Sequence, residues 1–456
     1  MIIIKSIFYI ISLSFILSGC SFFRTKEVKF SLNPQIQEMQ KEVSAINIER
    51  SIQKLVSFGT RNTLSEQQNK IRGVGAARDW LLSEFEKISS ACGMCLKTQI
   101  ETFEQPKTIR IPEPTKISNV FAVLTGTKDP NRVYIVSGHY DSVCSSPTDS
   151  VCEAPGANDN ASGTAVMLEL ARVMSKRKFE ATIIFMAFSG EEQGLLGAAH
   201  YAKKAKSANI NIEAILNNDI VGGVTSGKDF SNKDKVRIFS EGIPLNESEE
   251  ERKIRITYGN ENDGPSRQLA RYIKEQTDNY MSPYSFSVWM INRRDRYGRG
   301  GDQAAFLQQG FPAVRLTESE EDLLHQHQNV RTENKIFYGD TIDFVDFNYM
   351  AKVAQVNLVA LASMANAPRR PMDVTFTKNK QNNDTEIKWE AVKDDNLVGY
   401  EVVWRDTNSS EWTNFASVGN LTSYIIKGKS KDNYFFGVRS VSKDGNKSII
   451  SFAGKD

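Results

Sequence analysis

The chain contains 456 residues, and its 57 Lys and Arg against 55 Asp and Glu leave a formal net charge of +2. Its 40% hydrophobic and 25% charged residues are typical of a globular protein and exclude a disordered or fibrous one. The length suits two or three domains of roughly 100–200 residues each, and the near-neutral charge balance predicts no nucleic-acid partner.

The first 20 residues have the pattern of an export signal. Lys5 precedes an apolar run over residues 7–17, which is shorter than the about 20 residues that a membrane-spanning helix needs. The run closes with the letters LSGC, ending at Cys20, and this ending resembles the bacterial lipobox. In such signals the cysteine becomes lipidated and forms the new N-terminus. The alternatives are a signal anchor or a chance cysteine.

A lipid anchor at Cys20 implies attachment to a membrane of the bacterial cell envelope. Several acyl chains on one residue hold a protein on a membrane, whereas a single chain binds only marginally. Ser21, rather than Asp, follows the cysteine, which in lipoproteins of enteric type favours the outer membrane, facing the periplasm or the exterior. Residues 21–35 are polar and aperiodic, and they predict a tether.

The four remaining cysteines form two close pairs, Cys92 with Cys95 and Cys144 with Cys152. Exported chains meet an oxidising environment, so the even count predicts two local disulfides. The first pair also fits a redox motif or half of a zinc site, but the sequence holds no second CxxC to complete four thiolate ligands.

Strands and helices alternate between residues 36 and 367 and predict one α/β domain. Periodicity predicts helices over 75–88, 164–175, 265–279 and 347–366. Apolar runs predict buried strands over 117–124, 132–137, 181–188, 212–216 and 313–316. This alternation favours a mixed, mostly parallel sheet between layers of helices. Charged stretches over 227–263 and 292–302 are expected to leave the sheet.

A proline-bracketed linker at 367–371 ends the helical pattern. The runs 372–377, 385–389, 398–405, 423–426 and 434–442 predict short strands separated by turns. Trp389 and a late NYFFGVRSV run make residues 371–456 similar to a fibronectin type III domain, an all-β sandwich. We expect this domain to be a spacer or a binding module, because it holds no cluster of catalytic residue types.

Acidic and imidazole side chains follow three of the predicted strands. His139 ends one strand with Asp141 close behind, Glu191-Glu192 follow the next, and Asp219 follows a third. Ligands bind beyond the carboxyl ends of strands in open α/β sheets, and the loop PGANDNASG adds Asp159 nearby. Each motif alone also fits a turn, a helix start or a cap. Together they would be electrostatically costly without a cation, and nitrogen with carboxylate ligands suits zinc.

The motifs SGHYDS, PGANDNASG, SGEEQGLLGA and NND, in this order and spacing, resemble the M28 family of zinc metallopeptidases. The likeness begins near Phe58-Gly59-Thr60-Arg61 and runs to about residue 366. It implies two Zn²⁺ ions per chain, a metal-bridged hydroxide and a peptide substrate. The residue roles it implies are His139 and Asp219 on one zinc, Glu192 and a late histidine on the other, Asp159 bridging both, Glu191 as general base, and Asp141 fixing the tautomer of His139.

Two histidines are candidates for the last zinc ligand. His325 and His327 both follow the predicted strand at 313–316. Neither has the Asp that the family often shows four residues on. The Gln-His step at His327 resembles the family better, so we favour His327 and expect His325 at the pocket edge or surface. His200 is expected to be structural.

The leading hypothesis is a lipid-anchored dizinc aminopeptidase. A carboxypeptidase with the same metal set is the enzymatic alternative, while a glutaminyl cyclase of related fold fits less well because such cyclases use one zinc. A non-enzymatic M28-like binding ectodomain is the alternative from another class. Such proteins typically lose several ligands, and this chain keeps them.

Overall fold

A computed structural model describes residues 32–225, 231–377 and 383–454. The predicted lipidation site Cys20 and most of the predicted tether lie outside these ranges. Across the described ranges, no helix combines the length and apolar character needed to cross a membrane. Helix α1 (Pro34–Glu42) already occupies the end of the segment predicted as tether.

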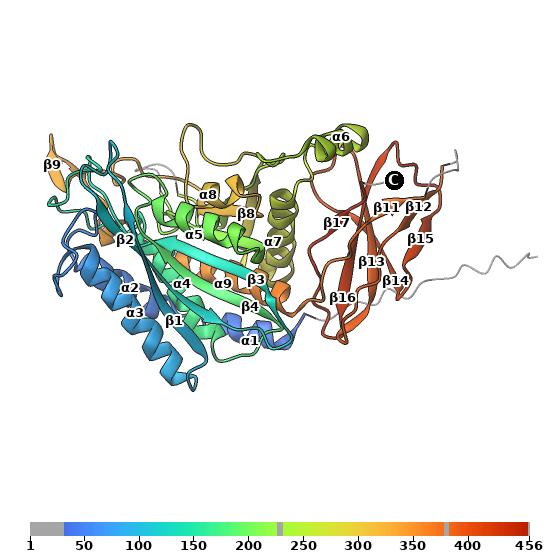
Figure 1. Cartoon of the computed structure of the whole chain (residues 1–456), viewed down its shortest axis with the longest axis horizontal. Helices are drawn as coiled ribbons and strands as arrows, with labels where there is room; N and C mark the ends of the chain where they lie inside the picture. Colours follow the sequence, from blue (N-terminus) through green and yellow to red (C-terminus); the bar gives the residue numbers. More distant parts are fainter. Residues whose placement is uncertain (1–31, 226–230, 378–382, 455–456) are drawn as a thin grey trace, which may run out of the picture. The chain divides into compact units, whose positions relative to one another are not determined.

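An eight-stranded mixed sheet forms the centre of the larger, N-terminal part (Figure 1). Its strand order is β1-β2-β4-β3-β5-β8-β6-β7. The strands are β1 (Leu96–Gln105), β2 (Thr115–Leu124), β3 (Asp129–His139), β4 (Ala181–Phe188), β5 (Asn211–Asn218), β6 (Lys235–Phe239), β7 (Ser287–Ile291) and β8 (Ala313–Glu318). The four central strands, β4, β3, β5 and β8, are parallel, whereas β1 and β2 are antiparallel to their neighbours. The predicted mixed, mostly parallel sheet is confirmed.

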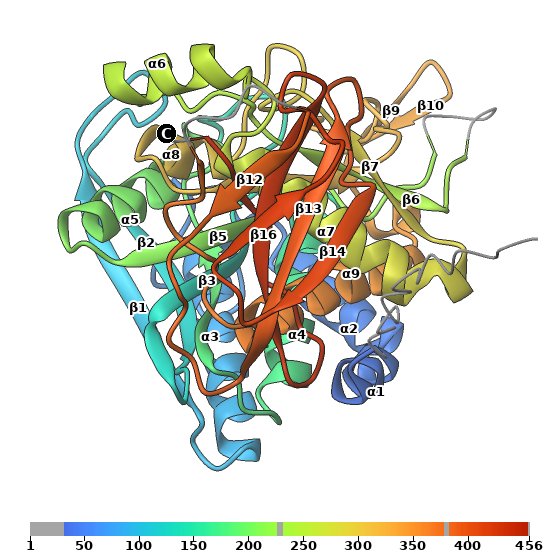
Figure 2. The same ribbon diagram turned by 90° about the vertical axis from the view of Figure 1, so that its right-hand side faces the viewer.

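Helices cover both faces of this sheet (Figures 1 and 2). Buried side chains of α1, α2, α3, α4, α7 and α9 share one apolar core with the sheet, and those of α5 and α8 share the other. The helices after α1 are α2 (Ala45–Val56), α3 (Gly73–Ala91), α4 (Ala161–Met174), α5 (Leu196–Ser207), α6 (Glu249–Tyr258), α7 (Pro265–Met281), α8 (Gln303–Gln308) and α9 (Phe347–Asn366). Short 3-10 turns lie at Ser282–Tyr284 and Ile342–Phe344. Strands β9 (Arg331–Glu333) and β10 (Ile336–Tyr338) form a small hairpin.

The expectation that residues 227–263 leave the sheet is wrong in part, because β6 lies within them and pairs with β7 and β8. The sequence of β6, KVRIF, mixes charged and apolar side chains because its lysine and arginine are only half-buried, whereas its three apolar side chains are buried. A short strand of this kind lacks the continuous apolar run of a central strand such as β4, in which every residue is buried.

The C-terminal part is a β domain of two sheets. One has the order β11-β12-β15 and the other β14-β13-β16-β17. Their bounds are β11 (Thr375–Phe376), β12 (Thr385–Lys388), β13 (Leu397–Asp406), β14 (Asn414–Gly419), β15 (Ser423–Ile426), β16 (Tyr434–Ser442) and β17 (Ser451–Phe452). Trp389, Tyr400 and Phe436 lie in its apolar core.

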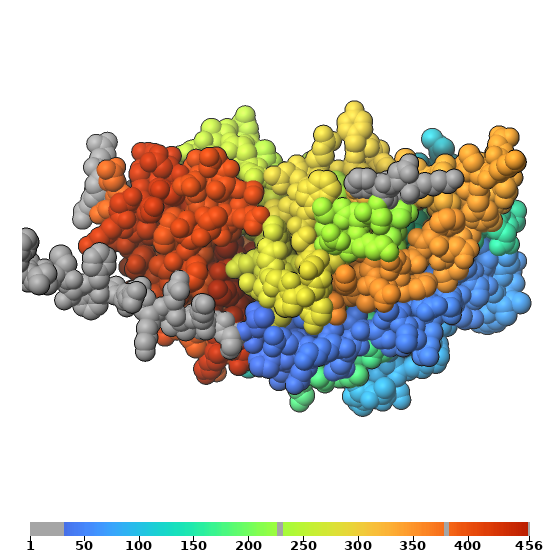
Figure 3. Space-filling view, turned by 180° about the vertical axis from the view of Figure 1, so that it is seen from behind, coloured from blue at the N-terminus to red at the C-terminus, as the bar shows by residue number. Residues whose placement is uncertain are grey.

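The C-terminal sheets lie against the segment that carries α7 (Figure 3, red beside yellow). Ion pairs join the two parts. Arg405 of β13 contacts Asp263 in a buried pair, and Arg439 of β16 contacts the partly exposed Glu275 of α7, each at 2.7 Å. Residues 31–456 accordingly form one compact unit.

Candidate metal centre

Five acidic and imidazole side chains from the sequence motifs meet at the carboxyl edge of the central strands. His139 is the last residue of β3, Glu191 and Glu192 follow β4, and Asp219 follows β5. Asp159 lies in the loop that precedes α4. Parallel neighbours end at the same edge of a sheet, which explains why motifs far apart in sequence converge.

Two glycines permit the close approach that brings these motifs together. A Cβ on Gly138 would lie 2.6 Å from the backbone of Gly163, and a Cβ on Gly163 would lie 2.0 Å from the carbonyl oxygen of Asn218. Helix α4 therefore begins directly against β3 and β5. This contact places the loop with Asp159 beside His139 and Asp219.

The converging side chains form two sets of three possible ligands. In each set the ligand atoms lie within 4.8 Å of one another, and the sets are His139 with Glu191 and Asp219, and Asp159 with Glu192 and His327. Asp159 connects them, because its Oδ1 lies 3.2 Å from His139 Nε2 and its Oδ2 lies 2.9 Å from His327 Nε2. One carboxylate thus faces both imidazoles, as a carboxylate that bridges two cations must.

The chemistry of these donors fits a pair of divalent cations. His139 Nε2 and Glu192 Oε1 are buried without a hydrogen-bond partner among the described residues, and unsatisfied buried polar atoms of this kind are rare. Four carboxylates and two imidazoles lie together, and such a cluster of negative charge is costly unless cations neutralise it. Imidazole and carboxylate ligands suit zinc.

Burial and mutual repulsion shift the pKa values of these groups. Burial raises the pKa of the Glu191 carboxyl well above its usual range, and it also raises the pKa of Glu192. Burial would raise the pKa of Asp159 as well, but the imidazoles of His139 and His327 hold it well below its ordinary value. The charge of Glu192 raises the pKa of His327 to about 11. A bound cation would replace these protons.

The structure brings His327, and not His325, to the carboxylates. His327 Nε2 lies 3.2 Å from Glu192 Oε2, and its side chain is 44% exposed. His325 turns away, pairs with Asp322 at 2.9 Å and stacks on Phe344. His200 stacks on Phe103 of β1.

Asp141 lies beneath the cluster and contacts both neighbouring motifs. Its carboxylate accepts backbone hydrogen bonds from Glu191 and Glu192 at 3.4 and 3.2 Å, and a third from the Thr63 hydroxyl. The backbone carbonyl of Asp141, at 3.1 Å, is the nearer partner of His139 Nδ1, while its carboxylate lies at 3.5 Å. Both parts of this residue therefore orient the cluster.

Three residues that support the site had no assigned role in the sequence analysis. Asp340 accepts hydrogen bonds from the backbone of Asn158 and Asp159. Arg315 forms an ion pair with the carboxylate of Asp219 at 2.6 Å. Arg61 donates to the carbonyl oxygens of Tyr140, the residue after His139, and of Pro155 and Gly156 at the start of the Asp159 loop. Of these three, a signal in the sequence pointed only to Arg61, which belongs to the motif where the resemblance to the M28 family begins.

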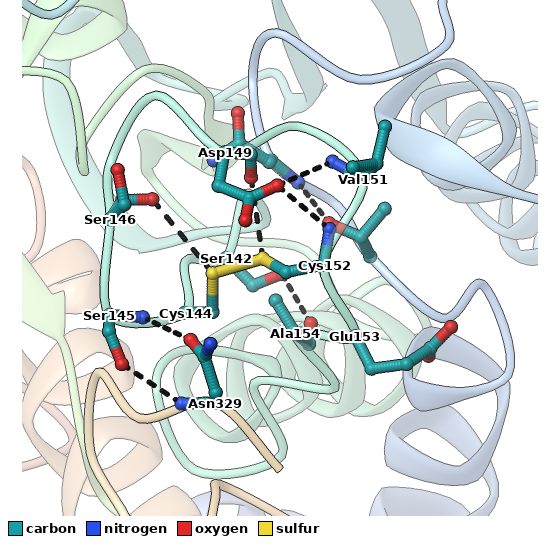
Figure 4. The surroundings of a disulfide bond; sticks show 12 residues. Ser142, Cys144, Ser145, Ser146, Asp149, Val151, Cys152, Glu153, Ala154 and Asn329 are labelled. Carbon is teal, nitrogen blue, oxygen red and sulfur yellow. Dashed lines mark hydrogen bonds between the residues drawn. A yellow bond between two sulfur atoms is a disulfide. The ribbon is translucent and has the colours of Figure 1, made fainter.

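Both predicted disulfides, Cys92–Cys95 and Cys144–Cys152, are present. The second closes the loop of residues 144–152 (Figure 4). Ser145 in this loop exchanges two hydrogen bonds with Asn329, next but one to His327, at 3.0 and 3.1 Å. The carbonyl of Pro147 accepts from the side chain of Gln193, the neighbour of Glu192, at 3.0 Å. The disulfide loop therefore supports the segments that carry two of the possible ligands, Glu192 and His327.

A cavity of about 380 Å³ opens above the cluster. Its lining includes Asp159, Glu191, Glu192, Asp219 and His327, together with Arg110, Arg296 and Arg299. The cavity gives a substrate access to both ligand sets.

The chain matches the model of peptidase family M28 over residues 119–356, which include both ligand sets. It is 45% identical over 422 residues to a probable zinc metalloprotease of Leptosphaeria maculans, covering 92% of this chain and 97% of that protein. A probable zinc metalloprotease of Pyricularia oryzae is 44% identical over 414 residues, covering 89% and 82%. Among solved structures, the LapA aminopeptidase of Legionella pneumophila has a TM-score of 0.51 at 19% identity, covering 78% of this chain and 80% of that one. This last likeness supports the fold.

Proposed function

The chain belongs to peptidase family M28 and is a zinc metalloprotease, and we propose that it is a dizinc exopeptidase that removes N-terminal residues from peptides. The proposal of two zinc ions rests on the position of Asp159 between His139 and His327. A carboxylate with one oxygen toward each ligand set supports two cations rather than one.

The donors divide into two groups around Asp159. His139 and Asp219 would hold one zinc ion, Glu192 and His327 would hold the other, and Asp159 would give one oxygen to each. Bound zinc supplies a Lewis acid and lowers the pKa of its water toward about 7.

Glu191 is the proposed general base. Burial raises the pKa of its carboxyl, which suits a group that must take up a proton near neutral pH. Its carboxylate lines the cavity and lies 4.0 Å from His139 Nε2. In this position Glu191 takes a proton from the attacking water and returns it to the leaving amine. Asp141 fixes the backbone of Glu191 and Glu192, so that the base and the ligand keep their separate places.

The test of this function is hydrolysis of a peptide panel by the zinc-loaded protein. An aminopeptidase cleaves peptides with a free N-terminus, fails on their N-acetylated forms and loses activity with a chelator. Cleavage of the N-acetylated forms from their C-terminal end would favour the carboxypeptidase alternative. No cleavage by protein carrying two zinc ions would favour the non-enzymatic binding role.

We propose in addition that Cys20 carries the lipid anchor, which would place the enzyme on the bacterial envelope. Mass spectrometry of the mature N-terminus tests this. A diacylated or triacylated Cys20 supports the anchor, and a chain that retains residues 1–19 contradicts it.

The C-terminal β domain is proposed to be fibronectin type III-like. Its two sheets and the buried Trp389 beside Tyr400 support this assignment. An experimental structure whose strand connections differ from those of that fold would exclude it.

A further inference from the structure

Three arginines line the cavity above the metal centre. Arg110 reaches it from the connection between β1 and β2, and Arg296 and Arg299 reach it from the loop between β7 and α8. The carboxylates of the cluster face the same cavity. A substrate at the cluster would therefore meet guanidinium groups as well.

The positive charge of the arginines around the loop between β7 and α8 is only partly balanced by carboxylates. Three guanidiniums share the carboxylate of Glu321, those of Arg237, Arg296 and Arg299, at 2.7, 3.1 and 2.8 Å. Asp295 adds a contact to Arg296 at 3.2 Å. Three positive charges therefore face two carboxylates. Partly buried charges need partners, so these arginines favour an anion.

Two of the cavity arginines keep donors for such an anion. Arg299 uses Nη1 on Glu321 and Gln326, and its side chain is 33% exposed. Arg110 uses Nη1 on the backbone carbonyl of Glu192, at 3.0 Å. Among the described residues, their other guanidinium nitrogens make no hydrogen bond. Arg296 differs, because Asp295, Glu321 and the carbonyl of Gly300 occupy its three nitrogens.

We propose that Arg110 and Arg299 bind a carboxylate of the peptide substrate and so determine the specificity of the enzyme. The guanidinium fork matches a carboxylate geometrically and binds it with two charge-assisted hydrogen bonds. The carboxylate is either an acidic side chain or the free C-terminus of a short peptide. This inference rests on the proposed peptidase function, because it concerns the same cavity.

Two matched pairs of substrates distinguish a side-chain carboxylate from a C-terminal carboxylate. Glu-Ala and Gln-Ala differ only in the side-chain carboxylate, and Leu-Ala and its C-terminal amide differ only in the terminal one. A charged hydrogen bond corresponds to about 10- to 100-fold in kcat/KM. We expect the wild-type enzyme to prefer the carboxylate member of at least one pair by this factor. R299Q and R110Q should each reduce that preference about tenfold, mainly through KM.

R293Q is the matched control. Arg293 lies in the same loop but does not line the cavity above the metals, and its guanidinium lies 5.7 Å from the centre of the exposed Tyr297 ring. Its preference should equal that of the wild type. The inference is overturned when both pairs are hydrolysed within twofold of each other, or when the preference survives in both R299Q and R110Q. Hydrolysis of the neutral peptides then leaves the peptidase function intact.

Calorimetric titration with glutarate gives a readout that does not need catalysis. The zinc-loaded wild type should bind glutarate about tenfold more tightly than R299Q does, and R293Q should match the wild type. If no peptide is cleaved but this difference is found, the carboxylate site stands and the peptidase function fails. Equal binding by all three proteins would contradict the carboxylate site.

Discussion

The carboxylate of Asp340 holds the backbone of Asp159, whose N–H it accepts at 2.6 Å. Its other oxygen accepts from the N–H of Asn158 at 2.8 Å. An Asn side chain has only one oxygen, so D340N leaves one of these buried N–H groups without an acceptor, at a cost of about 1–3 kcal/mol. Loss of such a supporting contact also weakens metal binding about 10- to 100-fold.

We therefore expect D340N to bind zinc more weakly and to unfold at lower denaturant concentration. Zinc titration against a competing chelator measures the first effect, and urea unfolding the second. D343N is the control, because Asp343 is exposed and close in sequence. A D340N protein with wild-type zinc affinity would show that this contact does not position Asp159.

Replacing Glu191 by Gln should separate the base from the ligands. E191Q removes the proton acceptor but keeps the shape, so both zinc ions should remain while kcat falls about 100- to 10,000-fold. E192Q and D159A should instead lose zinc. Metal analysis with steady-state kinetics on a neutral dipeptide distinguishes these outcomes. Loss of one zinc ion from E191Q would make Glu191 a ligand, as its place near His139 and Asp219 also permits.

Removing the Cys144–Cys152 disulfide should weaken the binding of one of the two proposed zinc ions. Its loop contacts Asn329 near His327 and Gln193 beside Glu192, whereas no hydrogen bond among the described residues joins it to Asp219. In C144S/C152S we expect about tenfold weaker binding of one ion, seen as a second step in a zinc titration. C92S/C95S, which removes the other disulfide, should keep the wild-type titration. An equal weakening of both ions would contradict a local effect.

The central sheet and the edge that carries the possible metal ligands could be predicted because their signals are local. Strand β4 is apolar throughout, and the polar motifs follow β3, β4 and β5 directly. Strand β1 was missed because it lies at the edge of the sheet and is little buried: in its sequence, LKTQIETFEQ, only Leu96 and Glu101 are buried. Its apolar residues also do not alternate with polar ones as a half-buried strand would require.

Contacts between distant segments could not be predicted. Asp340 lies 182 positions from Asn158, and no local pattern marks it as the acceptor for the metal loop. His325 and His327 have similar neighbours in sequence, and only the fold turns one ring onto Phe344 and the other toward Asp159. Partners of this kind depend on packing that one sequence does not display.

Glu241 should make the stability of the protein depend on pH. Burial raises the pKa of its carboxyl to about 7, and its Oε2 has no hydrogen-bond partner among the described residues. Between about pH 4.5 and 7 the folded state then binds the proton more tightly than the unfolded state does, so stability from this group falls as pH rises. E241Q removes the ionisable carboxyl and therefore also removes this loss of stability at higher pH.

We expect E241Q to be more stable than wild type by about 1–2 kcal/mol at pH 8 and to differ little at pH 4.5. Urea unfolding of both proteins at the two pH values measures this difference, in which the titration of other groups cancels. E250Q, at an exposed glutamate, should show no pH-dependent difference. A constant difference at both pH values would exclude titration of Glu241 as the cause.

Asp263 should be essential for joining the peptidase domain to the β domain. Both of its oxygens accept from Arg405 at 2.8 and 2.7 Å, and one also accepts from Arg271 at 2.8 Å. The side chains of Asp263 and Arg405 are 0% and 1% exposed. D263N removes the negative charge and leaves two buried guanidiniums without a counter-charge, which costs about 3–5 kcal/mol.

Urea unfolding of D263N should therefore begin earlier, and the β domain should unfold before the peptidase domain, because this ion pair links Arg405 of β13 to the segment before α7. Fluorescence of Trp404 and Trp412 can follow the β domain while peptide hydrolysis follows the peptidase domain. E249Q is the control, since its pair with Arg252 is exposed and should contribute less than about 1 kcal/mol. If D263N and E249Q unfold alike, the buried ion pair does not hold the domains together, and apolar contacts must do so.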